Sequence, residues 1–253
     1  MEKRTAIVTG MADGIGRFIT EHLLDTGYSV IGVDNREEPL REASAALSAR
    51  GEFMPQKTNV LDYDDVHAMA ERVFQEKGRI DILVNNVGGS GAISQPMEEI
   101  GLEDWCRVLD LNVKSTFLCI HAVVPYMKRA KWGRIVNMSS MAGRSRSYFG
   151  GVPYATAKAA LIGMVRQGSR EMAPFGITIN AVAPGVIVAS ERIRNYWDTK
   201  RSEEERTELV KSIPAGRTGT GDDVAAAVAY LVSDGASYVT GSVLDVNGGI
   251  WVG

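Results

Sequence analysis

Short runs rich in valine and isoleucine alternate with longer amphipathic stretches along the whole chain, and this alternation limits the possible folds more than any other feature. Seven runs read as strands: residues 5–10, 28–34, 52–60, 80–86, 133–140, 176–184 and 241–249. The first intervening stretch, FITEHLLDTG, has apolar residues at helical spacing and ends at Gly27, a typical C-cap. Such alternation specifies a parallel sheet with helices on both faces. We therefore predict a doubly wound α/β fold with seven parallel strands.

Length and composition favour a single domain over residues 1–253. The chain is long enough for one large buried core, and no linker rich in Pro, Gly or Ser divides it. Residues 186–214 interrupt the alternation with a highly charged segment that still contains Tyr196 and Trp197. An insertion of this length is usually a functional lid or a solvated excursion. We predict a lid at 186–214.

Charge and residue spacing argue against several classes of protein. A formal net charge of -3 gives no basic face for nucleic acid. The three histidines lack HExxH spacing and the two cysteines lack CxxC spacing, so we expect no metal site. The chain enters a strand almost at once without an apolar signal core, and no run of 18 apolar residues follows. We expect a cytoplasmic protein that has no membrane partner.

The first predicted strand ends in a glycine-rich turn, TGMADGIG, at residues 9–16. Gly10 permits a tight turn, Gly14 lets backbone amides approach a pyrophosphate, and Gly16 allows close packing of the following helix. The N-terminus of that helix, which includes Ile15, would face the phosphates with its partial positive charge. The turn therefore predicts a dinucleotide site.

An acidic residue at the end of the second strand supports the same site. Asp34 lies 18 residues beyond Gly16, where a carboxylate accepts hydrogen bonds from the adenosine ribose. The alternative is that Asp34 caps a helix beginning near Glu37. Asp34 and Asp13 would both repel a 2'-phosphate, so we predict NAD as the cofactor and regard NADP as less favoured. Arg36 lies close enough in sequence to weaken that preference.

Five further motifs follow in a fixed order: NNVG at 85–88, Asn112 within LDLNV, SSMAG at 139–143, YATAK at 154–158 and PG at 184–185. Together with the glycine turn they resemble the short-chain dehydrogenases/reductases, and the resemblance runs from about Thr5 to Gly249. It implies a Rossmann fold, an NAD(P)-dependent oxidoreductase acting on CH-OH groups, a small-molecule substrate, and a homotetramer or homodimer.

The chemistry of the YATAK motif can be worked out from its spacing. Tyr154 and Lys158, at i and i+4, project from one helix face about one turn apart. Lowering the phenol pKa from ~10 by about three units needs roughly 4 kcal/mol, which a nearby ammonium can supply in a desolvated cleft. Tyr154 would then exchange a proton with the alcohol or ketone as hydride moves to or from the nicotinamide. The resemblance implies that Lys158 also holds the nicotinamide ribose.

Two other catalytic residues follow from the resemblance. It implies that Ser140 hydrogen-bonds the substrate oxygen; strand alternation would turn the neighbouring Ser139 the other way. It also implies that Asn112 relays protons through a water to Lys158, although a polar residue within a helix is usually exposed.

The resemblance implies further cofactor contacts at Asn59, Val60, Asn86, Gly88, Pro184, Gly185 and Ile187. Relatives often place an aspartate at the position of Asn59, facing the adenine. They also usually place a threonine four residues after the glycine of the PG motif, where this chain has Ala189 followed by Ser190. Either Ser190 substitutes for that threonine, or backbone groups near Val186 and Ile187 hold the nicotinamide.

Arginines near the motifs suggest what the substrate is. Arg144 and Arg146 lie between Ser140 and Tyr154 in sequence, and the predicted lid adds Arg192 and Tyr196. Arginines can bind anionic groups bidentately, so we predict a small anionic or highly polar hydroxy substrate. The alternative is that these residues are surface charges or subunit contacts.

Three functions are consistent with this sequence. The favoured one is an NAD-dependent dehydrogenase of a secondary alcohol such as a sugar, polyol or hydroxy acid. The second resembles the 3-oxoacyl-[acyl-carrier-protein] reductases, which usually prefer NADPH. The third is a dinucleotide-binding sensor or scaffold without turnover, which would not need all four predicted catalytic residues.

Overall fold

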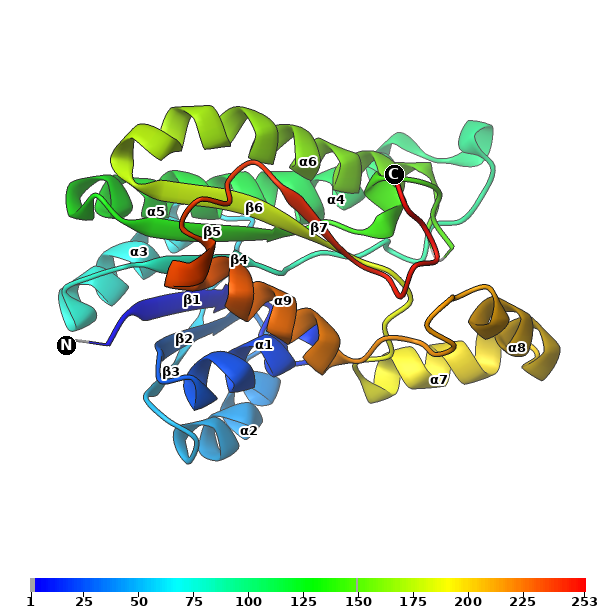
Figure 1. Ribbon diagram of the computed structural model, residues 1–253, viewed down its shortest axis with the longest axis horizontal. Helices are drawn as coiled ribbons and strands as arrows, with labels where there is room; N and C mark the ends of the chain where they lie inside the picture. The colour runs from blue at the N-terminus through cyan, green and yellow to red at the C-terminus, as the bar shows by residue number, and fades with distance from the viewer. Residues whose placement is uncertain (1–2, 149) are drawn as a thin grey trace.

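A single sheet forms the centre of the molecule in the computed structural model, which describes residues 3–148 and 150–253 except for the side chains of Arg192, Tyr196 and Lys200. Its seven parallel strands have the order β3-β2-β1-β4-β5-β6-β7 (Figure 1). They are β1 Thr5–Thr9, β2 Ser29–Asp34, β3 Phe53–Lys57, β4 Ile82–Asn85, β5 Gly133–Met138, β6 Ile177–Pro184 and β7 Val243–Val246. The predicted doubly wound, seven-stranded fold is confirmed.

Helices cover both faces of this sheet. They are α1 Gly14–Asp25, α2 Glu37–Ser48, α3 Tyr63–Lys77, α4 Leu102–Leu109, α5 Ser115–Ala130, α6 Val152–Met172, α7 Glu191–Lys200, α8 Glu203–Lys211 and α9 Gly221–Val232. One apolar core lies between the sheet and α1, α2 and α9, and the other between the sheet and α3, α5 and α6. Along β1, Ile7 enters the second core and Val8 the first, as side-chain alternation requires.

The two edge strands are shorter than the sequence pattern indicated. β3 ends at Lys57, whereas the pattern extends to residue 60, and β7 occupies only the middle of the predicted run. Pro55 lies within β3 and is tolerated because this strand pairs only with β2. The central strands β1, β2, β4, β5 and β6 are buried throughout, which explains their continuous apolar sequences.

The strand order places a crevice between β1 and β4. The chain builds the sheet outward from β1 to β3, then returns to β4 on the other side of β1 and proceeds to β7. Ligands of open α/β sheets bind at such a reversal, beyond the carboxyl ends of the strands. The glycine turn after β1 and the NNVG motif after β4 both lie there.

One long helical segment combines α4, a π-helical turn at Asp110–Lys114, and α5. By length and composition alone, Leu102–Ala130 could cross a membrane, but half of its most apolar window is buried inside the fold. This segment is therefore accounted for as a core helix of the domain, packed against α3 and β5.

Candidate active site

The glycine turn has one closed side and one open side. Gly10 (φ +66°) and Gly14 (φ +60°) adopt left-handed backbone conformations that favour glycine. A Cβ on Gly16 would overlap the carbonyl oxygen of Gly10, so α1 packs directly onto the turn. A Cβ on Gly14, in contrast, would meet no atom within 4 Å. The open side lies at the N-terminus of α1, a geometry that fits the pyrophosphate of a dinucleotide.

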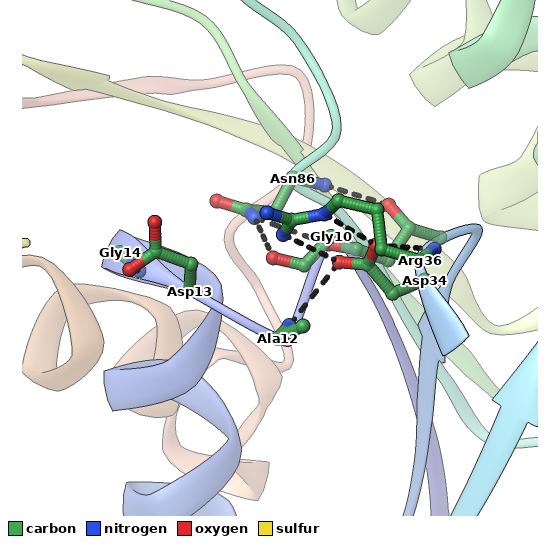
Figure 2. A network of polar contacts seen from close by, with 8 residues as sticks. Gly10, Ala12, Asp13, Gly14, Asp34, Arg36 and Asn86 are labelled. Atoms are coloured by element: carbon green, nitrogen blue, oxygen red, sulfur yellow. Dashed lines mark hydrogen bonds and ion pairs between the residues drawn. The ribbon is translucent and has the colours of Figure 1, made fainter. Parts of the chain in front are cut away.

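The NNVG motif braces this turn. The Asn86 side-chain amide donates hydrogen bonds to the carbonyl oxygens of Thr9 and Gly10, both at 3.1 Å, and the Asn86 N–H donates to Thr9 Oγ1 at 3.0 Å (Figure 2). Asn86 was predicted to contact the cofactor; in the structure its amide nitrogen holds the turn in shape. The sequence gave no indication of this bracing by Thr9 and Asn86.

The two carboxylates predicted to act together point in different directions. Asp13 caps α1 by accepting a hydrogen bond from the Gly14 N–H at 2.7 Å, whereas Asp34 lies on the other side of the turn beside Arg36 (Figure 2). Asp34 is buried and accepts from the Ala12 N–H at 3.3 Å. The capping alternative for Asp34 is wrong, because the N-cap of α2 is Arg36 and no side chain caps it.

The predicted adenine contacts lie beside the same crevice. Asn59 is exposed and its Oδ1 accepts from the Leu61 N–H at 3.1 Å, so this oxygen already stabilises a local turn. Val60 is buried in the core behind it. Their contacts with a cofactor remain predictions.

Ser140, Tyr154 and Lys158 come together from two elements. Ser140 follows β5, where its Oγ accepts from the Ala142 N–H at 3.1 Å and hydrogen-bonds the Tyr154 phenol. Lys158 is buried, and its Nζ donates to the Met138 carbonyl oxygen at 2.7 Å and lies 5.6 Å from the centre of the Tyr154 ring. Ser139 faces the other way, as alternation predicted, and donates to the Lys158 carbonyl oxygen at 2.8 Å.

Asn112 reaches the same group from the π-helical turn. Its side chain is fully buried, donates to the carbonyl oxygens of Gly89 (2.9 Å) and Val108 (2.8 Å), and accepts from the Gly89 N–H at 3.1 Å. A Cβ on Gly88 would overlap Asn112 Oδ1 and lie 2.9 Å from Lys158 Nζ, so these three residues meet at one point. Because its side-chain atoms already have partners, the proton relay through Asn112 remains a prediction.

The pKa shifts in this group differ from the expectation that Lys158 lowers the pKa of Tyr154. Burial raises the pKa of the Tyr154 phenol, and the hydrogen bond with Ser140 only partly opposes that shift. Burial lowers the pKa of Lys158 to about 7, because its ammonium is removed from water. The Tyr154 phenol is therefore protonated at neutral pH and suited to donate a proton.

The segment after β6 approaches the site through backbone contacts. The Gly185 N–H donates to the Val246 carbonyl oxygen at 2.9 Å, directly after Pro184, and Ile187 pairs with Gly219. Ser190 caps α7 by accepting from the Ile193 N–H at 3.2 Å. Its hydroxyl thus has a structural task, which favours the alternative that backbone near Val186 and Ile187 holds the nicotinamide.

The predicted lid forms two helices, α7 and α8, beyond the end of the sheet where β6 ends (Figure 1). An apolar cluster fixes its base: Val186, Leu209 and Ile213, with Tyr148, Trp197 and Ile250 packed against them. Arg201 also donates to the Tyr148 carbonyl oxygen at 3.0 Å. The segment is therefore packed onto the loop that follows Ser140, and its action as a lid remains a proposal.

The predicted substrate residues have varied surroundings. Arg144 forms an ion pair with Asp245 at 3.0 Å, donates to the Gly253 carbonyl oxygen at 3.0 Å, and lies over the Trp251 ring. These contacts make Arg144 a structural link between its loop and the end of the chain, so the substrate role is not supported for it. Arg146 is exposed and donates to the Tyr148 hydroxyl at 3.3 Å. The side chains of Arg192 and Tyr196 lie outside the described part.

Across the described residues, no group of three or more His, Cys, Asp and Glu side chains is placed to hold a metal ion. The geometry combines an open glycine turn at a helix N-terminus with a serine, a tyrosine and a buried lysine at the neighbouring strand end. A phosphate cradle beside a proton donor defines the class: an oxidoreductase that uses a nicotinamide dinucleotide.

Comparison with known proteins identifies the family. The family model described as enoyl-(acyl carrier protein) reductase matches residues 10–251. The sequence is 36% identical over 252 residues to the 3-oxoacyl-[acyl-carrier-protein] reductase FabG of Staphylococcus aureus, covering 98% of each chain. It is 37% identical over 252 residues to FabG of Escherichia coli, covering 99% of this chain and 98% of the other. Levodione reductase superposes with a TM-score of 0.90 at 30% identity, covering 97% of this chain and 96% of its own. The chain belongs to the short-chain dehydrogenase/reductase family.

Replacing Lys158 tests the pKa shift through stability. The Lys158 pKa is about 7 in the folded protein and near its ordinary value of 10.5 when unfolded, so the unfolded chain binds more protons between these values. Unfolding free energy should therefore rise with pH across this window in the wild type, and Lys158→Met should lack that rise. Denaturant unfolding between pH 6.5 and 9.5 measures both curves, and parallel curves would show that the amine is not desolvated.

Replacing Arg144 tests its structural role. Burial raises the pKa of Asp245 and Arg144 opposes that shift, so Arg144→Ala should lower the free energy of unfolding at pH 7 by about 1–3 kcal/mol. The difference should shrink as the pH falls and Asp245 gains a proton. The exposed Arg146→Ala should change stability by less than about 0.5 kcal/mol. Equal effects of the two substitutions would contradict this assignment.

Proposed function

We propose that the protein is a ketone reductase that converts a 3-oxoacyl thioester into the corresponding 3-hydroxy compound, with a nicotinamide dinucleotide as hydride donor. The observation that carries this proposal is the protonated Tyr154 phenol, hydrogen-bonded to Ser140 beside an open dinucleotide cradle. A phenol whose pKa is raised is a better proton donor than base at neutral pH, so the site favours reduction over alcohol oxidation.

Similarity to FabG proteins over almost the whole chain supports this choice of substrate class. The favoured prediction from sequence, oxidation of a sugar, polyol or hydroxy acid, is correspondingly less well supported. Its main support was the pair Arg144 and Arg146, and Arg144 is occupied by Asp245 and the end of the chain. The acyl-reductase alternative therefore replaces it as the proposed function.

The residues present can perform this reduction. The Ser140 hydroxyl and the Tyr154 phenol would both donate hydrogen bonds to the ketone oxygen, which polarises the carbonyl. When bound, the cofactor supplies a hydride to the carbonyl carbon. Tyr154 gives its proton to the oxygen, so one hydride and one proton convert C=O into CH-OH. Lys158, with a pKa of about 7, is partly protonated nearby and can return a proton to the phenolate.

The cradle also fits the cofactor that this reaction requires. Gly14 faces open space at the N-terminus of a 12-residue helix, where the pyrophosphate would lie. Lys158 would hold the nicotinamide ribose and backbone near Ile187 the nicotinamide, while the end of β2 would face the adenosine ribose.

We also propose a homotetramer or homodimer in the cytoplasm. The Phe117 and Tyr63 rings, on α5 and α3, are 53% and 52% exposed, and both lie 5.8 Å from the ring of His121. Subunit contacts commonly bury apolar surface of this kind. Both cysteines are free, which fits a reducing compartment. Light scattering should give two or four times the chain mass of 27.4 kDa; a monomer would exclude the assembly.

The reaction itself is tested by following nicotinamide absorbance with an acetoacetyl thioester and NADH or NADPH. We expect consumption of the reduced cofactor, and Tyr154→Phe should lower turnover by about 10²- to 10⁴-fold because the proton donor is lost. Tyr230→Phe, at an exposed tyrosine of α9, is the matched control and should retain full turnover.

Two other results would point elsewhere. Faster oxidation of sugars or hydroxy acids than reduction of the thioester would restore the dehydrogenase hypothesis. Dinucleotide binding without turnover of either substrate type would favour the sensor or scaffold.

A further inference from the structure

The carboxylate of Asp34 is fully occupied by hydrogen bonds within the chain. Its Oδ1 accepts from the Arg36 N–H at 3.1 Å and from Arg36 Nε at 3.0 Å, while Oδ2 accepts from the Ala12 N–H at 3.3 Å and from Arg36 Nη2 at 3.2 Å (Figure 2). A carboxylate offers about four acceptor positions, so none remains for another donor. Asp34 therefore cannot accept ribose hydroxyls unless the Arg36 side chain moves.

The ion pair also changes the charge at the end of β2. Asp34 is 5% exposed and Arg36 is 52% exposed, so the guanidinium forms the outer surface of the pair. The hydrogen bond with Asp34 is the main cause that raises the pKa of Arg36, which keeps the guanidinium charged. The negative charge that would repel a 2'-phosphate is thus neutralised from the solvent side.

Arg36 retains donors that face outward. A guanidinium has five N–H groups, and Asp34 engages one face of the fork through Nε and Nη2. The remaining N–H groups can reach an anion without breaking the pair. The nearest other cation, Lys57, stands in register with Asp34 on β3 but is paired with Glu37 at 2.7 Å. Arg36 is therefore the residue on which recognition of a phosphate would depend.

We infer that Arg36 determines cofactor specificity: held by Asp34, it accepts the 2'-phosphate of NADP(H), so the protein binds NADP(H) at least as tightly as NAD(H). Binding of NAD(H) requires the fork to leave Asp34 before the carboxylate can accept the ribose hydroxyls, whereas binding of NADP(H) keeps the ion pair. This replaces the preference for NAD that the sequence alone indicated, and it rests on the proposed dinucleotide-dependent function.

Direct binding measurements test this inference without turnover. Titration of the intact protein with NADPH and with NADH, followed by nicotinamide fluorescence, should give a Kd for NADPH equal to or below that for NADH. Arg36→Ala should weaken NADPH binding about 10- to 100-fold, the effect of losing hydrogen bonds to a charged group, and leave NADH binding unchanged or stronger. Arg41→Ala removes the same charge from an exposed position of α2 and should leave the ratio of the two Kd values unchanged.

Two further measurements keep the result interpretable. Arg36→Lys retains the charge without the fork and should recover part of the NADPH affinity; it also replaces Arg36→Ala if that variant does not fold. Adenosine 2',5'-bisphosphate should compete with NADPH in the wild type at lower concentration than adenosine 5'-monophosphate, and Arg36→Ala should abolish this difference.

The outcomes separate this inference from the proposed function. A wild-type Kd for NADH at least tenfold below that for NADPH would overturn the inference, as would an unchanged ratio in Arg36→Ala. In either case, reduction of the thioester with NADH would leave the proposed function intact. If neither cofactor binds, both the inference and the proposed function are wrong.

Discussion

The close contact between α1 and the glycine turn is the constraint on which the rest of the site depends. Because Gly16 lies against the carbonyl oxygen of Gly10 without room for a Cβ, the N-terminus of α1 has one possible position above the ends of β1 and β4. Asn86 fixes the turn from β4 with two hydrogen bonds. The phosphate cradle, the end of β2 and the catalytic group after β5 are then held at one edge of the sheet.

Burial explains the chemistry of the catalytic group better than the pairing of two side chains does. Lys158 loses water on all sides and gains one carbonyl partner, so its charge is unfavourable and its pKa falls to about 7. Tyr154 experiences the same desolvation with the opposite effect on its pKa. A neutral phenol and a partly charged amine can pass a proton in either direction, and the raised phenol pKa favours delivery to the substrate.

Much of the fold and the catalytic set could be predicted from the sequence, because both depend on local patterns. Alternating strands and helices gave the sheet, and spacing together with family resemblance gave Ser140, Tyr154 and Lys158. Contacts between distant residues could not be predicted in this way. Nothing in the sequence places Asp245 beside Arg144, 101 positions earlier, or shows that the Arg36 fork occupies Asp34. Asn112 was placed on a helix, but no pattern indicated the π-helical turn that buries its amide.

That π-helical turn also explains why Leu102–Ala130 resembles a membrane-spanning segment. A π turn inserts one residue into a helix and shifts its phase by about 100°, so the sides facing the core before and after it fall on different positions of one helical wheel. Val108 of α4 and Val123 of α5 each face the interior of the domain, although regular α-helical spacing would not align them. Apolar residues are consequently spread around the whole circumference, which is the pattern that hydropathy alone assigns to lipid contact. The same inserted residue that brings an amide to the reaction centre thus blurs the amphipathic signature of the longest helical segment in the described chain.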